Sequence, residues 1–541
     1  MCADHDTRCD KGYASGCEIL PGERPVARQP AGVTADPGRS SASPALSDGF
    51  ACTRERFEAL LGWAASEEAG ALEHSEFEER LASDGREMLR CLFQDSLDLR
   101  AVREPRLDLV VGSDGVRRAN VERSHERPLG TLMGEVRVSR IAYRARGQEN
   151  LYVADAALNL PEEKPSHGMR RLAAIEAPRG SFEEAQEAIV RQTGQRLGKR
   201  QLRELVVRSA VDFESFYEQR QRAAPAEEED VLILSCDAKG VVMRPEALRE
   251  QTRKQATDAQ QKLQTRLSKG EKRSRKRMAE VCAVYEVTPV QRTAADILPA
   301  TEQERQAARQ GPEATNKWLT ASVTDDAATV IGRMFAEAQR RDPGHKRPWV
   351  ALVDGNNHQI DRITKEARKR KLKVTILVDC VHVMEYLWDA AWCFFTECDP
   401  AAERWVQEKA RAVLDGQAST VAAAIRRKAT RLGLERAKRK NADTCADYLL
   451  AKRAYLDYPT ALTNGWPIAT GVIEGAYRHS VKDRMDITGA RWGLESAEAV
   501  LKLRALRSNG DFDEYWHYHR KQERRRVHES RYTHGVVPRG D

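Results

Sequence analysis

The stretch WVALVDGNNHQIDRITKEARKRKLKVTILVD, residues 349–379, decides the fold class. Two short apolar runs, 349–353 and 374–378, are rich in β-branched residues, and a helical pattern at 358–370 separates them. Short runs of this composition favour strands over helices. A strand–helix–strand unit is typical of an α/β sheet with helices on its faces.

Two earlier apolar runs extend this sheet, VLILSC at 231–236 and VCAVYEV at 281–287, and a helical stripe follows at 325–341. The first part of this α/β region is rich in strands, and strands alternate with helices only in its later part. This order indicates a mixed sheet flanked by helices. Polar residues at 221–230 form a linker in front of it, and 381–465 is helical throughout.

The remainder divides by composition and period. Residues 1–50 are rich in Gly, Pro, Ser and Ala, so we expect a disordered tail. A helical region is expected at 51–105, either as a helix pair or as one helix broken near Gly70. A small β-rich segment at 106–160 and a helix-turn-helix-like region at 161–225 follow it. The rest is expected to comprise a first catalytic part at 226–380, a helical insertion at 381–465, a last catalytic part at 466–510 and a basic tail at 511–541.

Two of these parts carry basic side chains in a regular pattern. In GEVRVSRIAYRARG, residues 134–147, the apolar positions predict one face towards a core and the arginines, Arg140 among them, a face towards solvent or DNA. In 181–218, Ser181 and Glu184 form a capping box, and a second helix at 197–210 begins with Lys199 and Arg200. A helical hairpin and a DNA-reading helix-turn-helix both fit this second pattern.

Composition excludes several classes of protein. The chain has 541 residues and contains no run near the ~20 apolar residues of a membrane helix, which excludes a membrane protein. The net charge is only +7, but basic residues concentrate at 251–280, 361–373, 425–440 and 520–531, which favours a polyanionic partner. Eleven scattered cysteines without a Cys-x-x-Cys pair favour a reducing cytoplasm.

Acidic residues follow three of the expected strands. Asp237 and Asp354 each stand at a strand end, and Asp379 follows a third strand with His382 one helical turn later. Any one of them has an ordinary explanation as a helix cap or turn former. Because ligands gather outside the carboxyl ends of strands, the three together favour a shared site, and carboxylates suit Mg²⁺.

A fourth acid lies in WPIATGVIEGAYRHSVKDRMDITGARW, residues 466–492. Glu474 falls in the first turn of a helix that begins near Thr470, and Arg478 and Lys482 follow at i+4 and i+8. This spacing stacks an acid and two bases on one helix face, as an exposed salt-bridge ladder also does. An acid that joins an Asp/Asp metal cluster, with bases beside it, suits phosphodiester chemistry.

These motifs resemble those of the DDE transposases of bacterial insertion sequences, most closely the group named after Kra elements. The resemblance covers about residues 106–508. Its pieces are GEVRVSRIAYRARG, ADAALNLP, CDAKGV, KRMAEVCAVYEV, VALVDGNNHQ, VDCVHVMEYLW and GVIEGAYRHSVKDRM with the following RW. The family usually has Gly after the first Asp, where this chain has Ala238. The resemblance implies an RNase H-like α/β catalytic domain with a helical insertion before the last acid.

The resemblance also implies the site. Asp237, Asp354 and Glu474 would be the catalytic triad and the ligands of Mg²⁺, or of Mn²⁺ in its place, with Asp379 and His382 as an auxiliary pair. DNA contacts are expected from Lys199, Arg200, Arg478, Lys482, Arg484 and Arg491. The activity would be cleavage at transposon ends followed by strand transfer. The partners would be terminal inverted repeats, target DNA and further copies of the chain, in the bacterial cytoplasm at the nucleoid.

Two other functions stay open on the sequence. A metal-dependent nuclease or resolvase would keep the fold and hydrolyse DNA without joining it. A DNA-binding regulator would use the same acids only as structural residues.

Overall fold

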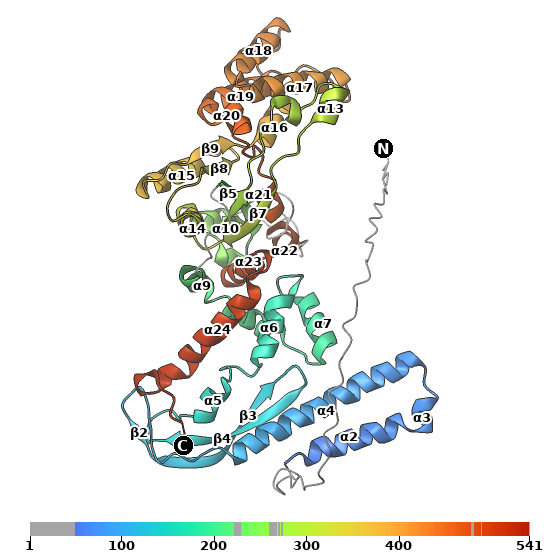
Figure 1. Ribbon diagram of the computed structural model, residues 1–541, viewed down its shortest axis with the longest axis vertical. Coiled ribbons are helices and arrows are strands. Elements are labelled where there is room, and N and C mark those ends of the chain that lie inside the picture. The colour runs from blue at the N-terminus through green and yellow to red at the C-terminus, as the bar shows by residue number, and fades with distance from the viewer. Residues whose placement is uncertain are drawn as a thin grey trace, which may run out of the picture. The chain divides into compact units, whose positions relative to one another are not determined.

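The structure is a computed structural model that describes residues 49–220, 229–258, 268, 271, 274–477, 481–487 and 489–539, without the side chains of residues 474, 476 and 477 (Figure 1). From Gly49 onwards the chain forms one compact unit. The expected tail at 1–50 and linker at 221–230 lie almost wholly outside the described residues.

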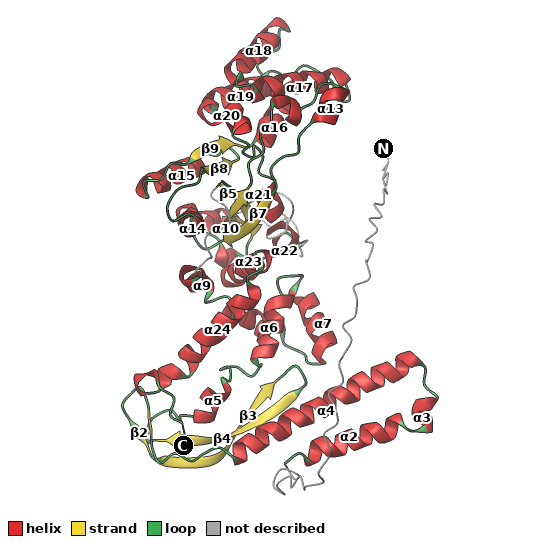
Figure 2. Ribbon diagram, viewed as in Figure 1, coloured by secondary structure: helices red, strands yellow, loops and turns green. Residues whose placement is uncertain are grey.

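A five-stranded mixed sheet is the centre of this unit (Figure 2). Its strands are β5 (Val231–Val242), β6 (Lys276–Val287), β7 (Ala314–Ser322), β8 (Trp349–Val353) and β9 (Thr375–Val378). They lie in the order β7-β6-β5-β8-β9, where β5, β6 and β7 are antiparallel and β8 and β9 run parallel to β5. The four predicted strands are present, and β7 was not predicted.

Helices flank the sheet, as the sequence predicted. They include α10 (Glu250–Asp258), α14 (Ala327–Arg341), α15 (Asn357–Lys369), α16 (Cys380–Ala391), α21 (Gly471–Tyr477), α22 (Asp483–Met485) and α23 (Leu494–Ser508). The helix α14 packs on β5, β6 and β7, and α23 packs on β7. Every position of the run 231–236 is buried, including the polar Ser235. The chain is therefore a mixed α/β protein.

The predicted helical insertion is present between β9 and α21. It continues from α16 through α17 (Pro400–Leu414), α18 (Ala418–Arg431), α19 (Lys440–Ala451) and α20 (Tyr458–Thr463). Figure 1 shows α17–α20 gathered beyond the β8–β9 edge of the sheet. Buried side chains of α17, α18 and α19 belong to the same hydrophobic core as the strands.

The N-terminal helical region is a set of separate helices. It comprises α2 (Ala51–Ala64), α3 (Glu67–Gly70) and α4 (His74–Val102), so the break predicted near Gly70 is confirmed. A β hairpin follows, β3 (Asn120–Gly130) with β4 (Glu135–Arg144), besides the short pair β1 (Val110–Val111) and β2 (Arg117–Arg118), and then α5 (Val153–Leu158).

The apolar positions of β4 are buried, as predicted, but they do not form one face. Val136 and Val138 belong to one hydrophobic cluster, and Ile141 and Tyr143 belong to another on the opposite face. Arg140 was predicted to face solvent or DNA, and this is wrong, because it is only 8% exposed. In a strand it shares the face of Val136 and Val138. Its guanidinium pairs with Asp155 at 2.8 Å and lies 4.2 Å from the ring centroid of Tyr152.

The predicted helical hairpin is formed by α7 (Phe182–Thr193) and α8 (Lys199–Arg208), between α6 (His167–Glu176) and α9 (Phe213–Gln219). The capping box is confirmed, since the Glu184 N–H donates to Ser181 Oγ at 3.1 Å and the Ser181 N–H to Glu184 Oε2 at 2.6 Å. Gly194 ends α7 with φ of 67°, a left-handed value that glycine adopts readily.

Residues 511–541, expected as a basic tail, contain the helix α24 (Phe512–Val527). Its apolar side packs on α9 and α23, and Tyr515 is fully buried. An ion pair of 2.8 Å joins Glu523 to Arg170 of α6, which is also fully buried. Among the described helices, none is both long and apolar enough to cross a membrane.

Candidate metal and nucleic-acid site

Asp237 lies within β5, and Asp354 directly follows β8, the parallel strand next to β5. Asp237 was predicted at the end of its strand, which is wrong, because β6 pairs with β5 as far as Val242. The strand β8 pairs with β5 only up to Ser235 and Leu352. Asp237 and Asp354 each come two residues after this last pair, so both lie just past the same end of the paired register.

The electrostatics agree with this register. Burial raises the pKa of Asp237, and the negative charge of Asp354 raises it further. The hydrogen bond that the Ala238 N–H donates to Asp237 Oδ1 at 2.6 Å lowers that pKa, as do the charges of Lys239 and His382. A carboxylate whose ionisation is disfavoured by burial and by a neighbouring acid is an environment in which a divalent cation binds favourably.

The helix α21, which contains the backbone of Glu474, packs on the same face of the sheet as Asp237. Asp237 pairs with Val281 in the register, so Tyr285 and Val287 share its face. These two side chains line a cavity together with Gly471 and Val472 of α21. The helix begins at Gly471, one residue after the predicted start.

The side chains of Glu474 and Arg478, together with the backbone of Arg478, lie outside the described residues. The predicted ladder from Glu474 through Arg478 to Lys482 is therefore described only at its last position, where Lys482 is exposed. For Glu474 the structure places only its helix, α21, which packs on β5, the strand of Asp237, and on the neighbouring strand β6.

Asp379 follows β9, the strand next to β8, and is fully buried. Its Oδ1 accepts from the Val381 N–H at 2.7 Å, and its Oδ2 accepts from the Thr470 N–H at 3.0 Å and from the Thr470 hydroxyl. All three donors belong to helix α16 or to the segment before α21. Asp379 therefore acts as a helix cap that ties the two segments together.

His382 interacts electrostatically with Asp237. Its charge lowers the pKa of Asp237, and its Nδ1 lies 3.0 Å from Glu385 Oε2. The auxiliary residues predicted as one pair thus have different surroundings: His382 is half-buried on the first turn of α16, and Asp379 is inside the fold.

The loop after β8 presents Asp354 by its own turn chemistry. The Asn356 N–H donates to Asp354 Oδ1 at 2.8 Å, and Tyr448 of α19 donates its hydroxyl to the Asp354 carbonyl at 3.2 Å. Gly355 has φ of 89°, and a Cβ there would lie 2.6 Å from the Tyr448 hydroxyl. Only glycine fits this position without strain.

Four of the six predicted DNA-binding residues meet in one cavity of about 700 Å³, which we call the arginine pocket. Lys199 and Arg200 come from the first turn of α8, Arg484 from α22 and Arg491 from the segment before α23. Sequence reasoning missed two further cations that line the pocket, Arg203 and Arg244. Arg203 follows Lys199 at i+4 and Arg200 at i+3, so helical spacing could have found it, whereas Arg244 is brought to the pocket only by the fold.

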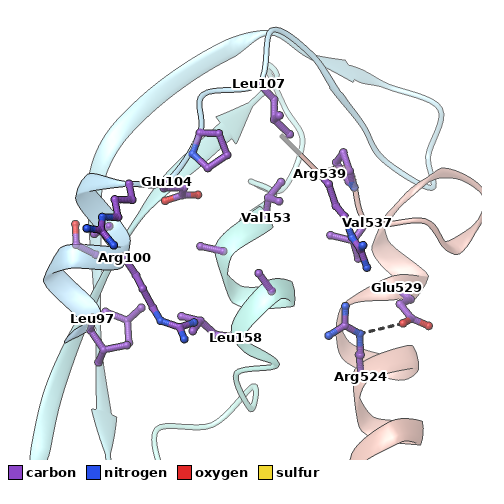
Figure 3. Close-up of a pocket in the computed structure, with 18 of the residues that line it drawn as sticks. Leu97, Arg100, Glu104, Leu107, Val153, Leu158, Arg524, Glu529, Val537 and Arg539 are labelled. Atoms are coloured by element: carbon purple, nitrogen blue, oxygen red, sulfur yellow. Dashed lines mark hydrogen bonds and ion pairs between the residues drawn. The ribbon is translucent and has the colours of Figure 1, made fainter. Parts of the chain in front are cut away.

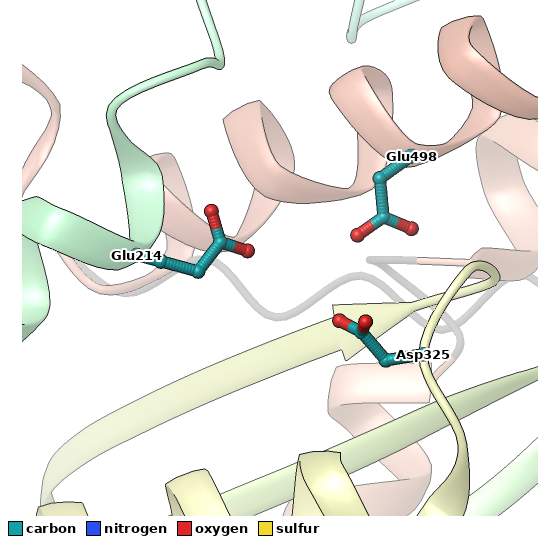
Figure 4. A group of neighbouring side chains, drawn as sticks. All are labelled: Glu214, Asp325 and Glu498. Atoms are coloured by element: carbon teal, nitrogen blue, oxygen red, sulfur yellow. The ribbon is translucent and has the colours of Figure 1, made fainter.

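A second acidic group, not predicted, consists of Glu214, Asp325 and Glu498 (Figure 4). Each offers an oxygen within 4.8 Å of the others. Arg333 pairs with Asp325 at 2.7 Å and with Glu214 at 3.5 Å, and Lys502 pairs with Glu214 at 2.8 Å and with Glu498 at 3.6 Å. The charges of these acids are therefore largely balanced by the protein, and the group is an ion-pair network.

Another cavity, of about 990 Å³, lies between the end of α4, α5 and the C-terminal segment (Figure 3). Its apolar residues include Leu97, Leu158 and Val537, and Arg524 pairs with Glu529 at 3.1 Å on one side. None of the predicted catalytic residues lines it.

No protein-family model and no curated protein matches this chain. The assignment of a function therefore depends on the geometry of the acids and of the arginine pocket.

Proposed function

We propose that this chain is a DDE transposase with an RNase H-like catalytic domain, which cuts DNA at transposon ends and joins them to target DNA in a metal-dependent reaction. One observation carries the proposal: Asp237 of β5 and Asp354, directly after the adjacent parallel strand β8, are close enough for the charge of one to act on the other, and the helix that contains Glu474 packs on β5. The strand order, with three antiparallel strands followed by two parallel ones, supports the RNase H-like fold.

The residues at this site fit a divalent cation. Asp237 and Asp354 are both half-buried, offer hard oxygen ligands and raise each other's energy when both are ionised. Mg²⁺ bound there would supply Lewis-acid chemistry, with activation of an attacking oxygen and stabilisation of a leaving oxygen. We propose Asp237, Asp354 and Glu474 as its ligands, with Mn²⁺ as a substitute.

The proposed residues have distinct roles. Asp237 and Asp354 would hold the metal at the reacting phosphodiester, and Asp379 positions the segment that leads into α21 through Thr470. In the first reaction, water attacks the phosphorus and the P–O3′ bond breaks, which frees a 3′-OH. In the second, that 3′-OH attacks a target phosphorus, so that a new P–O3′ bond forms and the target's own P–O3′ bond breaks. The attacking hydroxyl loses its proton to solvent, and the departing 3′-oxygen takes up a proton. Both are in-line displacements that need no nucleotide cofactor.

The basic surfaces have a role in DNA binding. We propose that the arginine pocket and the α7–α8 hairpin contact the terminal inverted repeats. Two transposon ends must meet in one complex, so we also propose that the chain acts as a dimer or larger assembly on DNA.

The decisive experiment measures strand cleavage with Mg²⁺ or Mn²⁺ on duplexes taken from the DNA on either side of the gene that encodes this chain. Asp354→Asn should abolish cleavage and leave DNA binding unchanged. Asp361→Asn, an exposed acid on α15, is the matched control and should cleave normally. Cleavage retained by Asp354→Asn would show that this carboxylate has no part in the reaction.

Calorimetric titration with Mn²⁺ separates the two acidic groups without an activity assay. Asp237→Asn should lose Mn²⁺ uptake. Glu498→Gln should retain it, because Arg333 and Lys502 already balance the second group. A chain that takes up no Mn²⁺ would be a regulator instead, and one that cleaves but never joins a pre-cut end would be a nuclease.

A further inference from the structure

Among the described residues that line the arginine pocket, cationic side chains outnumber acidic ones. Six of its lining side chains are cationic: Lys199, Arg200, Arg203, Arg244, Arg484 and Arg491. Glu183 is the single acid among its described lining residues, and it pairs with Lys199. Arg200 pairs at 2.9 Å with Glu204, which is outside the pocket. This balance favours a multiply charged anion over a single carboxylate.

Arg484 is the buried member of this group. It is only 3% exposed, and its Nε donates to the Ala177 carbonyl at 3.0 Å. Its guanidinium carbon lies 4.5 Å from the ring centroid of Trp492 and 5.3 Å from that of Phe182. The Nη2 atom is buried and has no hydrogen-bond partner among the described residues. A buried, unpaired donor of a charged group is costly, and an anion in the pocket would satisfy it.

The titration of Arg484 agrees with this geometry. Burial lowers the pKa of Arg484 to about 10, and the charge of Arg504 also lowers it. The guanidinium therefore keeps its proton at neutral pH.

The N-terminus of α8 adds to the positive potential of the pocket. This helix has 10 residues, and Gly198 at its N-cap offers no side chain to the free N–H groups of the first turn. Lys199 and Arg200 of that turn line the pocket. Backbone N–H groups at a helix start, together with the helix dipole, bind phosphate groups.

The pocket is attached to the strand that carries Asp237. The Trp492 N–H donates to the Val242 carbonyl at 3.1 Å, and the Arg244 N–H donates to the Trp492 carbonyl at 2.8 Å. Arg244 follows Asp237 by seven positions, which spans at most roughly 23 Å of extended chain. On duplex DNA this length corresponds to about seven base pairs.

We propose that the arginine pocket binds a backbone phosphate of DNA, within about seven base pairs of the phosphodiester held at Asp237 and Asp354. The position of that phosphate relative to a cleaved bond rests on the proposed function; the binding of a DNA phosphate does not. Arg484 and Arg491 contact the phosphate oxygens, and the pocket fixes the register of the duplex on the protein.

The test measures binding of a labelled DNA duplex to the full chain by fluorescence anisotropy, without metal, at salt concentrations from about 50 to 200 mM. Arg491→Ala and Arg244→Ala should each weaken binding about three- to tenfold and reduce the slope of log K against log salt by about one. Arg404→Ala, an exposed arginine on α17, is the control and should keep the wild-type slope. Wild-type slopes in both pocket variants would overturn the proposal.

A second measurement separates DNA from a small anion as the occupant. Inorganic phosphate that raises the melting temperature of the wild type and not of Arg491→Ala, with unchanged DNA slopes, would make the pocket a small-anion site and overturn the DNA assignment. Arg484→Lys, which keeps the charge inside the fold, should weaken DNA binding as Arg491→Ala does.

Failure of this proposal and failure of the transposase proposal are distinguishable. Asp354→Asn should bind DNA with the wild-type slope whether or not the wild type cleaves. A reduced slope in Arg491→Ala together with a wild type that never cuts DNA would leave the phosphate pocket in place and remove the transposase.

Discussion

Replacement of Asp379 by Asn should destabilise the fold strongly, because its carboxylate is fully buried and serves three donors. One donor, the Val381 N–H, binds Oδ1 at 2.7 Å, and the other two belong to Thr470 and bind Oδ2. Asn keeps one oxygen and replaces the other by an NH₂ group, which cannot accept from the Thr470 N–H. A buried donor is then left facing another donor.

The expected magnitude follows from these contacts. Loss of a buried hydrogen bond to a charged group costs about 1.5–3 kcal/mol, and the displaced Thr470 hydroxyl adds to it, so we expect about 2–4 kcal/mol in the free energy of unfolding. Asp326→Asn is the matched control. Asp326 also caps a helix and accepts from Thr329, at 2.8 Å, but it is exposed. Because Asn is as good an N-cap as Asp, this change should cost less than about 1 kcal/mol.

Urea unfolding followed by intrinsic fluorescence measures both variants, provided that the slope against urea stays at the wild-type value. Equal midpoints for Asp379→Asn and Asp326→Asn would refute the structural role of Asp379. A variant Asp379→Asn with wild-type stability and no DNA cleavage would go further, since it would make Asp379 a catalytic residue.

Two other predictions concern the fold around the site. Gly355→Ala should lower the free energy of unfolding by about 2–3 kcal/mol and reduce DNA cleavage, because it combines positive-φ strain with a clash against Tyr448. Gly433 has φ of 61°, and a Cβ there would have no atom within 4 Å, so Gly433→Ala should cost only about 1 kcal/mol by urea unfolding. Burial alone would raise the pKa of Glu523, but the charge and hydrogen bond of Arg170 outweigh it and lower the pKa to about 2. A carboxyl group with a lowered pKa in the folded state stabilises the fold above the usual carboxyl pKa, and this stabilisation is lost as pH falls. Glu523→Gln should therefore be about 3 kcal/mol less stable than the wild type at pH 7, and the difference should disappear between about pH 5 and pH 2. A stability difference independent of pH in acid-unfolding curves would contradict the pairing.

The central strands of the sheet could be predicted from sequence because burial on both faces makes them continuous apolar runs. The run 349–353 coincides with β8, and all five of its residues are buried. The strand β7 has the opposite character: its first residues are polar and largely exposed, and only its second half is buried. The hairpin strand β3 contains Pro128 and has a single buried position, Leu129, so it carries no alternating pattern. Its pairing with β4 is what makes it a strand.

The candidate site was predictable in its residue types and less so in its geometry. Asp237 interrupts an apolar run, which locally indicates a strand end, but pairing with β6, more than 30 residues later in the chain, extends the strand past it. Nothing in the sequence ranks Asp354 above Asp379. Their strands differ in the sheet: β8 is adjacent to β5, and β9 lies one strand further away. The order of the strands in the sheet depends on long-range pairing. It distinguishes Asp354, which follows the strand next to that of Asp237, from Asp379, which is buried as a helix cap.

The helical insertion takes part in the framework of the site. Tyr448 of α19 donates to the Asp354 carbonyl, and its ring stacks on Tyr386 of α16 with 3.9 Å between centroids. Lys452, which is only 6% exposed, donates to the side chain of Asn357 at the start of α15. Two contacts from one insertion segment therefore hold both ends of the loop that presents Asp354. Since the loop is bent by a left-handed glycine and has few contacts of its own, the insertion limits how far Asp354 can move from Asp237, and the distance between the two carboxylates depends on it.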